Sequence, residues 1–458
     1  MHLLTLIFDG VGIRNFGFSG FEAKARAAGH RVTYANATAF PLKEQLGLDE
    51  RKIHARAHPL ADTVKTIKQR AEISYLYWQT GDKAYPDGIP PLRAQNFKQH
   101  LKNLLIKSVI PFYASHKGRR KLQNRLENLA RKTDYYRQVR RMLEEVRPDV
   151  VLNTHQRPVT ALEPVLAARD LGIPTVGFIF SWDNLPKATL NIFTDYYLVW
   201  SDYMKNELLH YYPEIYEDQI FVTGTPQFEI HYDDGLKMSR RDFFASLGLN
   251  PQKKYLLFSG DDKRTSPNDP LYLEDLARAV RKKGEDWHIL FRPVPVDFSS
   301  RYDQVIQRHK DVITRVQPLW KKVDDTWQNY FPTAGDGRML YNLAEHTEAV
   351  FNIGSTMVFD FVTHNKPTVY FRYDHPESPH KDWSVEKIYN LIHFRSMPDE
   401  KAVIWARSAD DLGMIIDKIE RKDYDLSATR QWFDIINIPP QHRASERILL
   451  ALEKITNR

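Results

Sequence analysis

The feature that most constrains this chain is the stretch from Glu348 to Asp374, in which short apolar runs alternate with turn residues. Residues 349–353 form an apolar run of the kind found in buried parallel strands. Gly354 permits a sharp turn, and the pattern predicts a helix over 357–363. Residues 368–371 form a second apolar run. We therefore predict a strand–loop–helix–strand unit, a building block of α/β proteins.

The start of this predicted helix is a candidate anion site. The first amides of a helix have no partner within it, so Gly354, Ser355 and Thr356 would surround a phosphate group. Asp360 lies one turn further along and is placed to accept a hydrogen bond from a hydroxyl group, for instance of a ribose. The alternative is a plain βαβ unit without a ligand, which is common. These residues alone leave both interpretations open.

The length of the chain, 458 residues, favours two domains of about 200 residues each. Strand and helix patterns alternate through most of it, so we predict an α/β protein with two doubly wound, Rossmann-like domains. A candidate hinge at Gly224-Thr225-Pro226 divides them into 1–222 and 223–458. The last predicted helix, 445–456, is expected to cross back over the first domain.

A glycine-rich loop follows the first predicted strand. It contains Gly10 and Gly12, followed by Arg14. A third glycine in the register of dinucleotide-binding loops is missing, so the signal is weak. We expect these three residues to face a ligand at the edge of the first domain, with a simple tight turn as the alternative.

A long, helix-prone and basic segment interrupts the α/β pattern at about 92–147. Its basic residues are densest from Lys117 to Lys121, close to Phe112 and Tyr113. One interpretation is a solvated helical insertion, which we slightly favour. The other is a surface that rests on anionic lipid. Nucleic acid is a weaker third interpretation, because no binding motif accompanies the charge.

The composition narrows the class of protein. The chain has no cysteine, which excludes disulfides, thiolate metal sites and cysteine nucleophiles and fits a reducing compartment. It has no apolar run near the roughly 18 residues of a membrane span, and its start resembles a first strand, not a signal peptide. The net charge of +7 suggests an anionic partner. We expect a cytoplasmic protein, peripheral on the inner face of the membrane if the basic segment binds lipid.

Two doubly wound domains joined by a hinge resemble the GT-B glycosyltransferase fold. The segment Gly354-Ser355-Thr356, with Asp360 and Lys366-Pro367, is similar to the donor-binding segment of bacterial surface-polysaccharide transferases of the capsule and lipopolysaccharide type, and more distantly of the CDP-glycerol glycerophosphotransferase family. Arg292-Pro293 stands where these families carry a basic residue before proline.

The resemblance implies a nucleotide-sugar donor site at these residues. Arg292 and either Lys263 or Arg264 would neutralise the diphosphate, without a metal ion or separate cofactor. The alternative for Arg292 is a surface salt bridge.

A second motif indicates the catalytic base. The related family carries Trp-His-Gly-Thr-Pro-Leu-Lys after a strand of its first domain, and its histidine is taken as the base. The analogous stretch here runs from Trp182 to Lys187, with Asp183 in place of the histidine. We expect Asp183 to act as base, its pKa raised by Trp182, and His155 to be a competing base or a partner. The alternative for Asp183 is a structural turn.

The predicted activity is therefore the transfer of a sugar from a nucleotide-sugar donor, with inversion, to a surface polysaccharide or lipid-linked acceptor. Gly10, Gly12 and Arg14 would lie on the acceptor side. Three alternatives stay open: a CDP-glycerol-type glycerophosphotransferase, a UDP-sugar 2-epimerase, and a non-catalytic module that binds nucleotide-sugars. The epimerase shares the fold, but its carboxylate set is not evident in the first domain.

Overall fold

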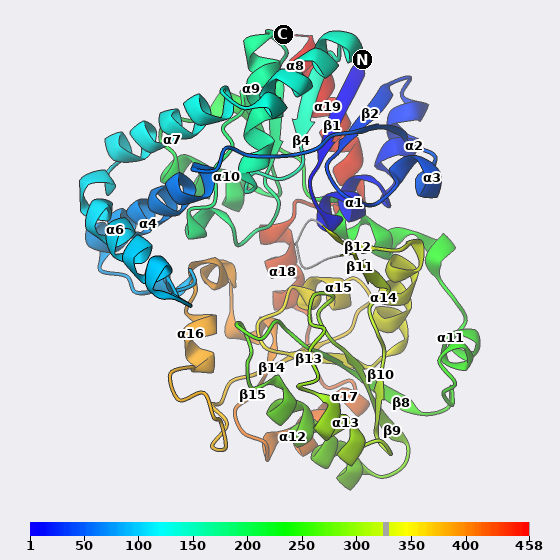
Figure 1. Cartoon of the computed structure of the whole chain (residues 1–458). Helices are drawn as coiled ribbons and strands as arrows, with labels where there is room; N and C mark the ends of the chain where they lie inside the picture. Colours follow the sequence, from blue (N-terminus) through cyan, green and yellow to red (C-terminus); the bar gives the residue numbers. More distant parts are fainter. Residues whose placement is uncertain (324–328, 458) are drawn as a thin grey trace.

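The computed structural model describes residues 1–323 and 329–457. Two parallel β-sheets, of seven and six strands, form its core, and helices cover their faces (Figure 1). In Figure 1 the sheet of the N-terminal half lies above that of the C-terminal half. The prediction of an α/β protein with two Rossmann-like domains is confirmed.

The first sheet has the strand order β3-β2-β1-β4-β5-β6-β7, and all its pairs are parallel. Its strands are β1 (His2–Ile7), β2 (Arg31–Asn36), β3 (Asp49–Lys52), β4 (Val150–Asn153), β5 (Thr175–Phe178), β6 (Tyr196–Val199) and β7 (Ile220–Val222). Every residue of β4 and β5 is buried, as expected for apolar strands covered on both faces. The order reverses between β1 and β4, and ligands of such sheets bind beyond the carboxyl ends of the strands at this point.

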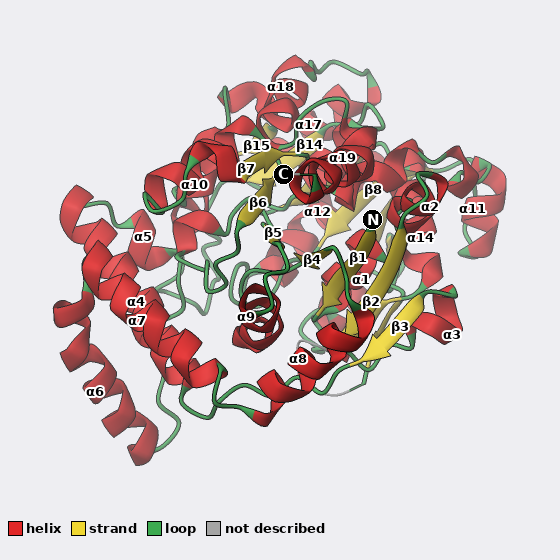
Figure 2. Ribbon diagram, turned by 90° about the horizontal axis from the view of Figure 1, so that it is seen from above, coloured by secondary structure: helices red, strands yellow, loops and turns green. Residues whose placement is uncertain are grey.

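The helices of the first half are α1 (Gly10–Phe16), α2 (Phe21–Ala27), α3 (Leu42–Leu46), α4 (Ala61–Thr80), α5 (Ala84–Asp87), α6 (Phe97–Tyr113), α7 (His116–Ala130), α8 (Asp134–Val146), α9 (Leu162–Asp170) and α10 (Asp202–Tyr211). The predicted helical insertion consists of α6, α7 and α8. It is part of a larger layer, because α4 packs against both α6 and α7. Figure 2 shows α6 as the outermost helix of this layer. Within the described ranges, no helix combines the length and apolar character needed to cross a membrane.

The second sheet has the order β10-β9-β8-β13-β14-β15 and is also parallel. Its strands are β8 (Lys254–Ser259), β9 (Trp287–Arg292), β10 (Ile313–Arg315), β13 (Ala349–Asn352), β14 (Thr368–Phe371) and β15 (Ile404–Ala406). Its helices are α11 (Arg240–Ser246), α12 (Asp269–Lys283), α13 (Asp303–Arg308), α14 (Ala334–His346), α15 (Met357–Val362), α16 (Val385–Tyr389) and α17 (Asp411–Glu420). The predicted strand–loop–helix–strand unit is β13, α15 and β14. A small antiparallel pair, β11 (Trp320–Lys322) and β12 (Tyr330–Pro332), contacts α1 of the first half.

The chain crosses between the halves twice, at neighbouring places. The first crossing is the 3-10 helix Pro226–Tyr232, and the second leads through α18 (Ser427–Ile436) to α19 (Ala444–Thr456). Glu229 of the first crossing accepts hydrogen bonds from the backbone N and Oγ of Ser445, at 2.6 and 2.7 Å. Helix α19 packs on α2, so the last helix lies on the first half (Figure 1).

Candidate functional site

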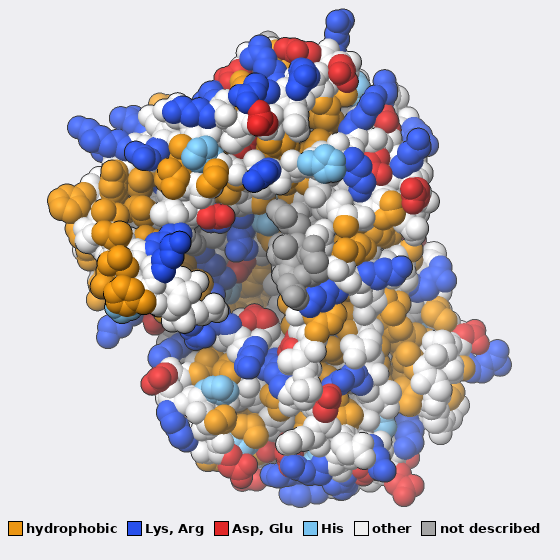
Figure 3. All heavy atoms as spheres, in the orientation of Figure 1, with side chains coloured by type: hydrophobic (Ala, Val, Ile, Leu, Met, Phe, Trp, Pro, Cys, Tyr) orange, Lys and Arg blue, Asp and Glu red, His pale blue; other side chains and the backbone are white. Residues whose placement is uncertain are grey.

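The two halves enclose a cavity of about 280 Å³ at the carboxyl ends of the second-sheet strands. Figure 3 shows a hollow between the halves, in which Lys and Arg side chains are visible. One wall comes from α1 and the first crossing, and the other from the loops after β8, β9 and β13 and the start of α14. Its polar lining comprises Arg14, Gln227, Ser259, Asp261, Arg292, Thr333, Asp336, Arg338, Ser355, Thr356 and Asp360. The structure thus brings five of the predicted site residues together: Arg14, Arg292, Ser355, Thr356 and Asp360.

Arg292 ends β9 and is buried in the wall of this cavity. Its Nη2 donates to Oδ1 of Asp336 at 2.9 Å. Asp336 is itself fixed by the backbone N of Leu319 and by Nε1 of Trp320, both at 2.8 Å. The Nη1 of Arg292 is buried without a hydrogen-bond partner among the described residues. The side chain is only 7% exposed, so it is not the surface salt bridge considered as the alternative. A guanidinium fixed at one nitrogen and unpaired at another suits an anionic ligand.

Arg14 reaches the same cavity from the first half. It belongs to α1, and its Nη2 donates to Oε1 of Gln227 at 2.8 Å. Burial lowers the pKa of Arg14, and the carboxylates of Asp360 and Asp336 oppose this shift, so the guanidinium stays charged at neutral pH. Two arginines from opposite halves therefore line one cavity.

The loop between β13 and α15 is less open than predicted. Gly354 has a φ of +64°, and a side chain there would meet the ring of Phe394 at 2.8 Å. The backbone N of Ser355 donates to Asn352 Oδ1 at 3.0 Å, and that of Met357 approaches the Ser355 hydroxyl at 3.4 Å. The expectation of bare amides is wrong at these two positions, because neighbouring side chains satisfy them. Ser355 and Thr356 still line the cavity.

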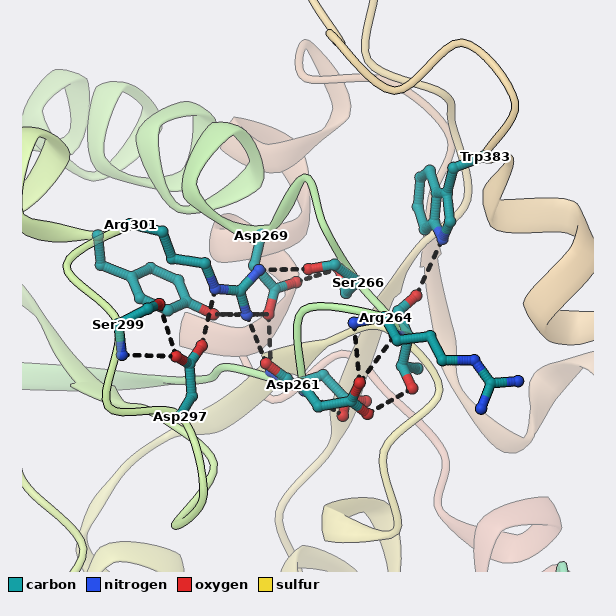
Figure 4. A network of polar contacts seen from close by, with 11 residues as sticks. Asp261, Arg264, Ser266, Asp269, Asp297, Ser299, Arg301 and Trp383 are labelled. Carbon is teal, nitrogen blue, oxygen red and sulfur yellow. Dashed lines mark hydrogen bonds and ion pairs between the residues drawn. The ribbon is translucent and has the colours of Figure 1, made fainter. Parts of the chain in front are cut away.

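Lys263 and Arg264, predicted to neutralise a diphosphate, do not line the cavity. Both are exposed, on a loop whose turn is fixed by Asp262 Oδ1, which accepts from the backbone N of Arg264 at 2.8 Å. Figure 4 shows the Arg264 side chain extending away from a network that anchors the same loop. In that network Arg301 bonds Asp297 at 2.7 Å and also the Asp261 carbonyl oxygen. The prediction for these two residues is wrong for this conformation, because the loop folds back onto buried carboxylates.

Gly10 and Gly12 do not form a ligand loop but the first turn of α1. A side chain at Gly10 would lie 2.1 Å from the carbonyl oxygen of Tyr330, so this glycine permits close packing of β12 on α1. The backbone N of Gly12 donates to Asp9 Oδ1 at 2.8 Å. The prediction that these glycines face an acceptor is therefore corrected. One serves packing, and the amide of the other is already bonded.

His155 follows β4 at the carboxyl edge of the first sheet and forms a buried pair with Asp9. Its Nδ1 is hydrogen-bonded to Asp9 Oδ2, and its ring stacks on Phe180 with centroids 3.9 Å apart. Burial alone would raise the pKa of Asp9, but the charge and hydrogen bond of His155 lower it. The Nε2 of His155 is buried, and no described residue is hydrogen-bonded to it. A histidine oriented by a carboxylate at one nitrogen and unpaired at the other is typical of a general base.

Asp183 has the opposite character to that predicted. Its carboxylate accepts from Ser181 Oγ at 2.6 Å and from Asn184 Nδ2 at 2.8 Å, and it pairs with Lys187. Burial would raise the pKa of Asp183, but the charges of Lys187 and His393 and the hydrogen bonds lower it far below its ordinary value. The expected upward shift is wrong, because the Lys187 ammonium compensates burial. Such a weakly basic carboxylate fits the structural alternative.

Several residues that line the cavity could not be recognised as site residues from the sequence. Asp336 stands in an Ala-Gly-Asp-Gly stretch typical of a turn, and its bonds to Arg292 and Trp320 arise only in the folded chain. Gln227 and Arg338 stand in segments without any recognised motif. Among the residues the structure describes, no group of three or more His, Asp or Glu side chains is arranged to hold a metal ion.

No protein-family model matches this chain, and no curated protein matches it. The predicted likeness to the CDP-glycerol glycerophosphotransferase family therefore gains no support.

Solved structures do match over almost the whole chain. A Listeria monocytogenes protein proposed to be a UDP-N-acetylglucosamine 2-epimerase has a TM-score of 0.58 at 11% identity, covering 100% of this chain and 97% of that one. A Rickettsia africae glycosyltransferase has a TM-score of 0.53 at 11% identity, covering 99% of this chain and 98% of that one. The Neisseria meningitidis UDP-GlcNAc 2-epimerase bound to UDP-GlcNAc has a TM-score of 0.51 at 11% identity, covering 99% of this chain and 100% of that one. The chain therefore has the GT-B fold.

Proposed function

We propose that this chain is a GT-B enzyme that binds a nucleotide-sugar in the cavity between its halves and transfers the sugar to a hydroxyl group. The observation that carries the proposal is the pair of arginines, Arg14 and Arg292, which line one cavity from opposite halves. The unpaired Nη1 of Arg292, which is buried in this conformation, would bind the diphosphate once the atoms covering it move, and Arg14 would add a second positive charge. The acceptor would be a glycan or a lipid-linked saccharide.

In this proposal His155 is the general base and Asp9 holds its ring in place. The acceptor hydroxyl gives its proton to Nε2 of His155 as its oxygen bonds to the sugar carbon. The bond from that carbon to the diphosphate oxygen breaks, and the arginines stabilise the negative charge that develops there. Because Nε2 is buried in this conformation, an acceptor reaches it only when the covering side chains move.

The second candidate function is a UDP-sugar 2-epimerase. It is favoured by the whole-length similarity to structures described as UDP-GlcNAc 2-epimerases. The two activities differ in one simple assay. An epimerase converts its nucleotide-sugar without an acceptor, whereas a glycosyltransferase releases the nucleoside diphosphate only as sugar is transferred.

Titration calorimetry with UDP, CDP and GDP tests the donor site. We expect one of the three to bind at least tenfold more tightly than the others, because a nucleotide cavity discriminates between bases through a few hydrogen bonds worth about 1.4 kcal/mol or more in total. Failure of all three to bind would refute the site. Turnover should also persist in EDTA, and full loss of turnover there would contradict the proposal that no metal ion is needed.

Helix α6 supports the proposal that the acceptor is lipid-linked. Its exposed side chains combine apolar residues, such as Phe97 (80% exposed), Leu105 (62%) and Phe112 (83%), with lysines. Figure 3 shows hydrophobic side chains gathered at this outer edge of the molecule. An exposed helix with apolar and cationic side chains suits the surface of an anionic membrane.

Vesicle flotation tests this membrane proposal. We expect the chain to float with anionic vesicles, less so at high salt, and not with neutral ones, because each contacting lysine contributes about 1 kcal/mol. Leu105→Ser should reduce flotation. The matched control is Leu450→Ser, which changes a leucine of similar exposure (59%) on α19. Equal recovery with anionic and neutral vesicles would leave the basic layer as a solvated insertion.

A further inference from the structure

A chain of four titratable side chains runs from the cavity toward solvent. Asp360 lines the cavity, and its Oδ1 lies 2.7 Å from Nε2 of His231. The Nδ1 of His231 lies 2.9 Å from Nε2 of His364, and Nδ1 of His364 lies 2.8 Å from Oε2 of Glu345. The side chains of His231 and His364 are 0% and 3% exposed, whereas that of Glu345 is 26% exposed. Three consecutive hydrogen bonds therefore connect the cavity with the surface.

The geometry of this chain sets how many protons its hydrogen bonds need. Each of the three hydrogen bonds needs one proton, but two ionised carboxylates and two neutral imidazoles supply only two. If His231 donates to Asp360 and His364 donates to Glu345, both neutral rings present lone pairs to each other across 2.9 Å. All three contacts are hydrogen bonds at the same time only when the chain holds one further proton.

The surroundings of the chain make His364 the neutral ring of the two and keep Glu345 ionised. Burial, and then the charge of His231, lowers the pKa of His364 to about 4, so His364 acts as the neutral acceptor. Lys237 holds Glu345 as a carboxylate, with Nζ 2.7 Å from Oε1. The titratable and charged groups around the chain are Arg14, Lys237, Tyr341 and His346, with Asp233 and Asp234 near Tyr341.

We propose that Asp360, His231, His364 and Glu345 form a proton relay that stores one proton on His231 and delivers it to Asp360 at the cavity wall. Delivery is a single step, in which the Nε2 proton of His231 moves to Oδ1 of Asp360. His231 then stays neutral and still donates from Nδ1 to His364, so all three hydrogen bonds persist. In the opposite direction, the Nδ1 proton of His231 passes to His364, and the Nδ1 proton of His364 passes to Glu345 at the surface.

The relay deepens the proposed function and, in its ligand step, rests on it. A diphosphate bound in the cavity would be repelled by a carboxylate at Asp360, because like charges at short range destabilise each other. Protonation of Asp360 removes this repulsion and creates a hydrogen-bond donor. In this proposal Asp360 carries a proton toward a bound diphosphate, which differs from the role expected from the sequence, that of an acceptor for a ribose hydroxyl.

Nitrogen NMR of the full chain labelled at histidine tests the stored proton without any ligand. At about pH 8 a histidine with the ordinary pKa of about 6.5 is neutral, yet we expect one ring with both nitrogens protonated. This signal should vanish in His231→Gln. It should also vanish in His364→Gln, because a glutamine amide can donate to His231 and the additional proton is no longer needed. If all rings of the wild type are neutral at this pH, the relay is wrong.

The control is His288→Gln, which alters a buried histidine that is hydrogen-bonded to Thr314 on the second sheet. It should leave the doubly protonated ring unchanged. Circular dichroism and the unfolding midpoint establish that each variant is folded, and the wild-type titration decides the proposal even if a variant does not fold.

Calorimetry with UDP between about pH 7 and 9 tests delivery to Asp360. We expect the affinity of the wild type to fall severalfold over this range, with proton uptake on binding, and that of His364→Gln to be lower and independent of pH. Binding of UDP with a flat pH profile in the wild type would overturn the delivery step while the donor site stands. If neither UDP, CDP nor GDP binds, the proposed function fails, and the ligand-free NMR titration still decides whether the relay exists.

Discussion

Replacement of His155 by alanine is expected to lower the rate of sugar transfer by about 10²–10⁴, the usual effect of losing a general base. The reason is the buried pair with Asp9, which fixes Nδ1 and leaves Nε2 unpaired. Asp183→Asn should keep most of the wild-type rate, because Lys187 and two hydrogen bonds already make Asp183 a poor base. Initial rates with a nucleotide-sugar and an acceptor, measured beside donor affinity, check both variants.

Donor affinity serves as the control for this experiment, since His155 does not line the cavity and its loss should leave nucleotide binding intact. Asp9→Asn should reduce turnover less than His155→Ala, because it disturbs the orientation of the ring but keeps Nε2. A result in which Asp183→Asn abolishes turnover and His155→Ala does not would restore the roles expected from the sequence. If both variants turn over normally, neither residue is the base.

Arg292→Ala is expected to weaken nucleoside diphosphate binding by about ten- to hundredfold and to destabilise the protein by about 3 kcal/mol. The first effect follows from the loss of the unpaired Nη1, and the second from leaving Asp336 buried without its cation. The cost lies at the low end for a broken buried pair, because Asp336 keeps its bonds from Leu319 and Trp320. Calorimetry and urea denaturation measure the two effects separately.

Two variants make this experiment specific. Arg292→Lys retains a charge next to Asp336 but lacks the second donor, so we expect near-normal stability with weakened binding. Arg241→Ala removes an arginine whose side chain is 83% exposed and pairs with Asp242 at 3.5 Å, and it should cost at most about 1 kcal/mol and leave binding unchanged. Unaltered affinity in Arg292→Ala would remove Arg292 from the donor site.

The sequence predicted the fold well where the signal is local. The unit over 348–374 alternates apolar runs with turn residues, and β13, α15 and β14 follow that pattern. Helix α1 was missed because Gly10 and Gly12 are poor helix formers. It forms because Asp9 accepts hydrogen bonds from its first amides and because β12, some 320 residues away in sequence, packs on it.

The site was predicted only in part, because several of its contacts join residues that are distant in sequence. Arg292 was recognised because a charged residue at the end of a buried strand faces the crevice of such sheets. Lys263 lies four residues beyond the end of β8, where Asp262 forms a local turn that directs the loop outward. The bond from Arg301 to the Asp261 carbonyl oxygen, which anchors this loop, joins residues 40 positions apart. The bond between His231 and Asp360 joins residues 129 positions apart, so no local sequence pattern predicts it. The pKa of Asp183 likewise depends on its pairing with Lys187.

The two neighbouring crossings between the halves determine the kind of motion that the halves can make. A single connection would allow the halves both to bend and to twist relative to each other. We expect two connections bonded side by side, through Glu229 and Ser445, to act as a hinge with a single axis, which permits bending and resists twisting. Arg14 and Arg292 would then approach each other along one fixed arc, so that closing the halves changes the separation of the arginines while keeping their relative alignment.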